Sequence, residues 1–63
     1  MRKKSEGYLI EFITIGNSVK VCAVDPKTGV EVSIVGPKKA GQQELSRNAV
    51  NKLIYVLEKQ GLR

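Results

Sequence analysis

The chain has 63 residues and a formal net charge of +5, and it contains one Cys and no His. A chain of this length forms at most one domain, whose core supplies roughly 3–5 kcal/mol of net stability. A lone Cys excludes an internal disulfide. Without His, the usual ligands of a structural zinc site are also missing. Oligomerisation is therefore the remaining way to add stability to so small a domain. No apolar run is long enough to span a membrane or to form a signal core, and we expect a cytoplasmic protein with a reduced thiol.

Residues 1–7 are polar and basic, and they are predicted to form a flexible arm ahead of a single domain at residues 8–63. The arm contains three consecutive cations, Arg2, Lys3 and Lys4. The whole chain contains 11 Lys and Arg but six Asp and Glu. This excess of positive charge raises the expectation of an acidic or nucleic-acid partner.

Two turns divide residues 8–36 into three predicted strands of an antiparallel meander. If residues 16–17 form a two-residue hairpin loop, Phe12 lies opposite Val21. If residues 26–29 form a four-residue turn, Val21 lies opposite Ile34. Both registers place the same apolar set on one face of the sheet. Its members are Ile10, Phe12, Val19, Val21, Ala23, Val30, Val32 and Ile34.

An amphipathic helix is predicted from about Gln42 to Gln60, with Gly61 as its stop. The fold class is therefore α+β, a three-stranded meander with one C-terminal helix packed on one face. The apolar arc of the helix spans about 180°, which is wider than one contact with the sheet requires. Two interpretations remain open: one flank of the arc, Val50, Ile54 and Leu57, is free to meet a partner, or the helix sits deep and wraps the whole arc against the first strand and the arm.

The second face of the predicted sheet also carries aliphatic residues that nothing in the chain covers. We therefore predict a small interaction module that forms a homo-oligomer, most simply a two-fold dimer. Two interfaces compete, and the flat sheet face is favoured because uncovered aliphatic residues on it invite aggregation. The sheet-face candidates are Leu9, Ile13, Val24 and Val35, with Ile15 on the same face, and the helix candidates are Val50, Ile54, Tyr55 and Leu57.

Nucleic-acid binding is the alternative function. Sheets that bind nucleic acid place cations and aromatic rings on their open face, whereas this face offers one Lys, two Glu and no ring. The positive charge lies elsewhere, and a loose surface that follows phosphates remains open beside the simpler interpretation of solvated charge. The candidate contacts are Arg2, Lys3, Lys4, Lys38, Lys39 and Arg47.

Catalysis is not expected. The chain has no His to act as a base, and its carboxylates are spread over separate elements. Cys22 is predicted to lie between Glu11 and Ser33, where a carboxylate opposes formation of the thiolate. The loop at residues 36–41 lacks the glycine spacing and the Ser or Thr of a phosphate-binding loop. No cofactor or metal is therefore predicted.

A set of short stretches carries a resemblance to a known family: Glu11-Phe12, residues 16–21, 23–25 and 28–37, Leu45, Ala49, Lys52-Leu53 and residues 55–57. On these residues the chain resembles a family of short, uncharacterised bacterial proteins along nearly its whole length after the arm. Some relatives carry the label serine hydroxymethyltransferase, which we reject here because 63 residues are too few for the fold of a pyridoxal-phosphate enzyme. The resemblance implies one intact domain and supplies no functional residues.

Overall fold

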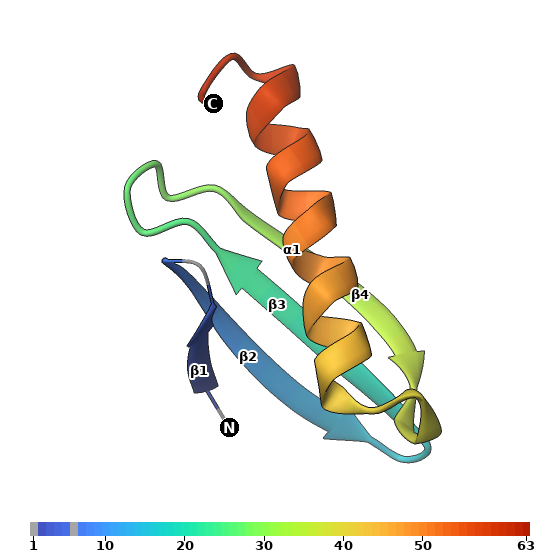
Figure 1. Cartoon of the computed structure of the whole chain (residues 1–63). Helices are drawn as coiled ribbons and strands as arrows, with labels where there is room; N and C mark the ends of the chain where they lie inside the picture. The colour runs from blue at the N-terminus through green and yellow to red at the C-terminus, as the bar shows by residue number, and fades with distance from the viewer. Residues whose placement is uncertain (1, 6) are drawn as a thin grey trace.

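The structure, a computed structural model, describes residues 2–5 and 7–63. Its elements are β1 (Arg2–Ser5), β2 (Tyr8–Ile15), β3 (Ser18–Val24), β4 (Glu31–Pro37), the short 3-10 helix η1 (Lys38–Ala40) and α1 (Gln42–Lys59). The strands form one antiparallel sheet in the order β1-β2-β3-β4. Figure 1 shows α1 lying across one face of this sheet, above β3 and β4. The predicted meander with one C-terminal helix on one face is confirmed.

The register of the central strands also agrees with the prediction. Phe12 is opposite Val21, and Val21 is opposite Ile34. The first turn uses Gly16 at a φ of 59°, a left-handed conformation that a two-residue hairpin loop requires. The local chemistry of two turns therefore sets the pairing of three strands.

The turn between β3 and β4 is held by Asp25, whose side chain is 8% exposed. Its Oδ1 accepts a hydrogen bond from the backbone N–H of Lys27 at 3.0 Å, and its Oδ2 accepts one from the Thr28 hydroxyl at 3.1 Å. The Thr28 oxygen in turn accepts from the N–H of Val30 at 3.2 Å. An Asp at the start of a turn commonly bonds to the backbone in this way.

Residues 2–5, which are predicted to belong to a flexible arm, form the edge strand β1. Ser5 is paired with Tyr8 and Arg2 with Glu11, so β1 and β2 make a hairpin. The outer edge of β2 carries backbone groups that need hydrogen-bond partners, and a polar segment can supply them whatever its side chains are. Met1 and Glu6 lie outside the described residues, and the division into an arm and a domain stays a prediction.

The core lies between α1 and the sheet. Val50 and Leu57 are 3% and 1% exposed in the single chain, so they belong to this core and their predicted role in an interface is wrong. α1 crosses β3 and β4, and the side chains of Ile10 and Phe12 from β2 fill the space beside it. Val50 and Leu57 are therefore covered within the chain itself. The buried cluster consists of Ile10, Phe12, Val19, Val21, Ala23, Val32, Leu45, Ala49, Val50, Leu53 and Leu57.

Both ends of α1 are set by glycines. Gly41 precedes the helix without a side-chain cap. At the other end the N–H of Gly61 donates to Glu58 O at 3.1 Å, and the N–H of Leu62 donates to Leu57 O at 2.8 Å. With Gly61 at a φ of 71°, these two bonds form a Schellman motif, as the predicted stop requires. Within the described residues, no helix combines the length and apolar character needed to cross a membrane.

Candidate interface on the open sheet face

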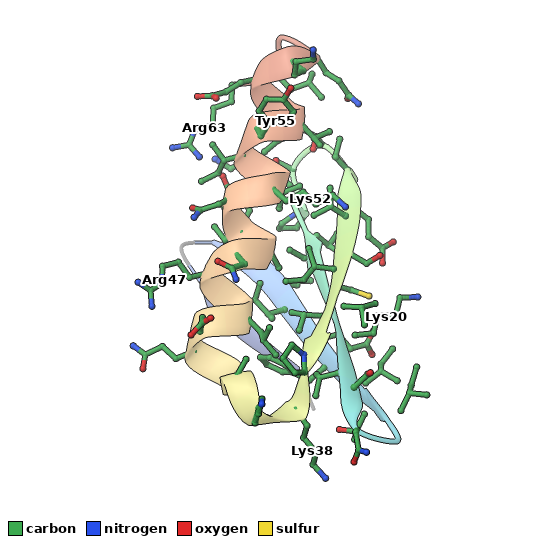
Figure 2. All side chains as sticks on the ribbon, turned by 90° about the vertical axis from the view of Figure 1, so that its right-hand side faces the viewer. Lys20, Lys38, Arg47, Lys52, Tyr55 and Arg63 are labelled. Carbon is green, nitrogen blue, oxygen red and sulfur yellow. The ribbon has the colours of Figure 1, made fainter. Side chains whose placement is uncertain are left out.

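The face of the sheet that points away from α1 is covered by no other element of the described chain. Figure 2 views the sheet nearly edge-on, with α1 on one side and Lys20 projecting from the other. We call this surface the open face. Its residues on β2, β3 and β4 are Leu9, Glu11, Ile13, Ile15, Ser18, Lys20, Cys22, Val24, Glu31, Ser33, Val35 and Pro37.

The register divides the open face into four rows that cross the three strands. From the β2–β3 hairpin onward, the first row is Ile15, Ser18 and Pro37, the second Ile13, Lys20 and Val35, the third Glu11, Cys22 and Ser33, and the fourth Leu9, Val24 and Glu31. The exposed aliphatic side chains therefore gather in the first two rows, while both carboxylates lie in the last two.

The exposed aliphatic groups are large. Ile13 is 40% exposed, Ile15 61% and Val35 69%, whereas Leu9 and Val24 are half-buried. Of the predicted sheet-face residues, Ile13 and Val35 thus remain open to solvent. Ile15, which the sequence placed on this face, extends the same surface to the hairpin. Ile13 and Ile15 lie together on β2, and Val35 lies on β4 across the central strand. Large exposed aliphatic side chains gathered at one end of a sheet face are typical of interaction surfaces.

Charges of both signs accompany this patch. Lys20 lies between Ile13 and Val35, and Glu11 lies one row away on the neighbouring strand. Cys22 occupies the middle of the face, opposite Glu11 and Ser33 as predicted, and is 6% exposed. The thiol is therefore shielded within the described structure, and it presents little surface to a reagent or substrate.

The helix candidates do not form one surface. Val50 and Leu57 are in the core, Ile54 is half-buried against it, and Tyr55 is 59% exposed on the outer side of α1. The ammonium of Lys59 lies 5.7 Å from the centre of the Tyr55 ring, which is a cation–π distance. The structure leaves Tyr55 as the one exposed member of this predicted set.

The candidate nucleic-acid contacts are spread around the molecule. Lys38, Lys39 and Arg47 are exposed, but Lys38 projects from the hairpin end of the sheet and Arg47 from the far side of α1 (Figure 2). Lys52 is engaged at the edge of the sheet, where its Nζ donates to Ser33 O at 2.8 Å. For Arg2, Lys3 and Lys4, only the place of the backbone in β1 is described.

The surface also carries two depressions. A shallow groove of about 490 Å³ at the hairpin end of the open face is lined by Asn17, Pro37, Lys38 and Lys39. A cleft of about 280 Å³ at the other end is lined by Gly7, Tyr8, Asp25, Lys27, Leu57, Leu62 and Arg63, and in it Arg63 donates to the Tyr8 hydroxyl at 2.9 Å. Among the described residues, no three His, Cys, Asp or Glu side chains cluster as metal ligands would.

A comparison with protein families gives a match over most of the chain. The model of a family described as a domain of unknown function (DUF6898) matches residues 5–60. No curated protein and no solved structure matches the chain. The match begins at Ser5, the last residue of β1, and ends just beyond α1, so it covers β2, β3, β4 and the helix together.

Proposed function

The chain belongs to the DUF6898 family, and from the geometry of its open face we propose that it is a non-enzymatic module that works as a homodimer. The observation that carries this proposal is the aliphatic patch on a sheet face that the chain's own helix does not cover. A lone, shielded thiol fits a cytoplasmic location for such a module.

The patch is large enough to matter for a protein of this size. Burying an aliphatic side chain completely contributes about 1.5–3 kcal/mol. With the exposed fractions of Ile13, Ile15 and Val35, covering them contributes roughly 2.5–5 kcal/mol per copy. This gain is similar to the net stability that the core of so small a domain supplies. Covering the patch in a dimer would therefore raise the free energy of unfolding by an amount that matters for a domain of this size.

A second copy of the chain is the occupant that the two signs of charge on the open face allow. The protein carries a net charge of +5, so two copies repel at long range and must attract through opposite charges within the contact. The open face carries both signs, with Lys20 in its second row and Glu11 and Glu31 in its third and fourth rows. A surface that contains complementary charges can pair with itself around a two-fold axis.

The dimensions of the face set the expected affinity. Three strands spaced about 4.8 Å apart and seven residues long give an area of about 14 by 23 Å. This is at the small end for specific interfaces, where weak and transient complexes are found. We therefore expect a dissociation constant in the micromolar range, and the measurement must reach high protein concentrations.

Light scattering coupled to size exclusion, from about 10 µM to about 1 mM, tests the dimer across the affinities that small interfaces show. One chain has a mass of 6.9 kDa, so the dimer has about twice that mass. Val35→Lys should shift the protein to the monomer, whereas Tyr55→Lys adds the same charge on the outer side of α1 and should not. A wild type that remains a monomer at the highest concentration contradicts the proposal.

Nucleic-acid binding is the second outcome that the experiments separate. Titration with labelled duplex and single strands at two salt concentrations measures it, because contacts with phosphates weaken steeply as salt rises. The scattered directions of Lys38, Arg47 and Lys52 favour solvated charge over one continuous phosphate-binding surface. A micromolar affinity that falls steeply with salt, and that falls further in a Lys38→Ala, Lys39→Ala variant, would support this alternative.

A further inference from the structure

We propose that the two open faces pack against each other with their strands running in opposite directions, so that Lys20 of each copy lies against Glu11 of the other. This inference rests on the proposed dimer and adds its geometry. Two sheets that face each other around a two-fold axis have that axis in the plane between them. The axis can run along the strands or across them, and the two directions bring different residues together.

An axis along the strands places each row of the open face against the same row of the second copy. The central strand β3 then lies over its counterpart, and Lys20 meets Lys20 in the middle of the interface. In the next row β2 lies over β4 of the other copy, so Glu11 faces Ser33 and meets no opposite charge. Two charges of the same sign are therefore brought together at Lys20, where the surrounding aliphatic side chains exclude water and reduce screening.

An axis across the strands reverses the order of the rows. When the faces overlap fully, the second row lies on the third row of the other copy, and the first row lies on the fourth. Each strand then lies over its own counterpart, so Lys20 lies over Cys22 of the other copy with Glu11 beside it on the adjoining strand, within reach of the long Lys side chain. This contact occurs twice because of the symmetry. Glu31 comes to lie opposite Pro37 of the other copy, next to the exposed Lys38 (Figure 2).

Full overlap covers the aliphatic patch in both directions, but Ile13 lies over Val35 of the other copy when the axis runs along the strands and over Glu11 when it crosses them. Since the apolar area removed from water is similar, the charges decide between the two directions. The hydrophobic effect depends on the area removed from water and not on which apolar group supplies the contact. Full overlap covers the same Ile13, Ile15 and Val35 in either case. Glu11 already has an interaction within the described chain, but a carboxylate has about four acceptor sites and can also accept a hydrogen bond from Lys20 of the other copy.

One substitution separates the two directions without reversing a charge. Lys20→Gln removes an attraction if the axis crosses the strands, and it removes a repulsion if the axis runs along them. Sedimentation equilibrium should therefore show a weaker dimer than that of the wild type. A tighter dimer in Lys20→Gln would overturn the proposed geometry while leaving the dimer itself in place.

Mixing two charge-reversal variants tests the contact directly. Lys20→Glu and Glu11→Lys each place like charges together in their own homodimers, and each should weaken dimerisation by about tenfold or more. An equimolar mixture restores both contacts between chains and should associate nearly as well as the wild type. A contact within one chain would give no such recovery, because mixing does not change the residues that a chain carries.

A second pair of variants protects the test against misfolding. Far-UV circular dichroism of each variant first shows that it is folded, and if Glu11→Lys is not, Glu31→Lys is mixed with Lys38→Glu in its place. These two residues are exposed, so their substitution leaves the core untouched. If the wild type is dimeric and neither mixture recovers association, the geometry is wrong. If the wild type is monomeric, the proposed function fails as well.

Discussion

Ser46 is the polar side chain whose replacement should stabilise the protein most clearly. It lies on the buried side of α1 and is 7% exposed, and within the described chain its Oγ has no hydrogen-bond partner. A buried hydroxyl that loses its bonds to water without replacing them costs about 1–3 kcal/mol. The substitution Ser46→Ala removes this cost and leaves the surrounding aliphatic contacts in place.

Two smaller effects accompany the substitution. Alanine has the higher intrinsic helix propensity, by roughly 0.5 kcal/mol. Loss of one oxygen atom leaves a small void, which costs about 0.3 kcal/mol. The net increase in the free energy of unfolding is therefore about 1–3 kcal/mol, which corresponds to a rise in Tm of about 4–8 °C for each kcal/mol in a domain of this size.

Urea denaturation followed by circular dichroism measures the effect, at one fixed protein concentration because dimerisation itself stabilises the folded chain. Asn48→Ala is the matched control, since Asn48 is exposed on the same helix and reports helix propensity alone. Ser46→Ala should stabilise by clearly more than the control. If it destabilises instead, the Ser46 hydroxyl has a partner in solution and the reasoning is wrong.

Two further predictions concern the sheet. Gly36→Ala should lower the free energy of unfolding by about 1–3 kcal/mol, because a Cβ at this position of β4 would overlap the buried side chain of Leu45. The same urea denaturation measures this effect. An unchanged midpoint would show that α1 shifts to make room at no cost. Hydrogen exchange should show weaker protection for the amides of β1 than for those of β3, because β1 is a four-residue edge strand and β3 is paired on both sides. Equal protection in the two strands would contradict the prediction of an arm that opens easily.

Strand alternation by itself places the sheet-face candidates correctly. It assigns Ile13 and Val35 to the open face, and both are exposed there. Alternation is a property of the extended backbone, so a correct register assigns every side chain of a strand to its face. No local feature of a helix sequence determines how deeply the helix packs against a sheet. For this reason the prediction that Val50 and Leu57 meet a partner is wrong.

The sequence by itself determined the pairing of β2, β3 and β4 and the limits of α1, because turns and helix stops depend on residues close together in the chain. Gly16, Asp25 and Gly61 act in this local way. The tertiary structure alone decided that residues 2–5 join the sheet and how far α1 sinks into the core. Both outcomes depend on groups distant in sequence, namely the unpaired edge of β2 and the space beside α1 that Ile10 and Phe12 fill.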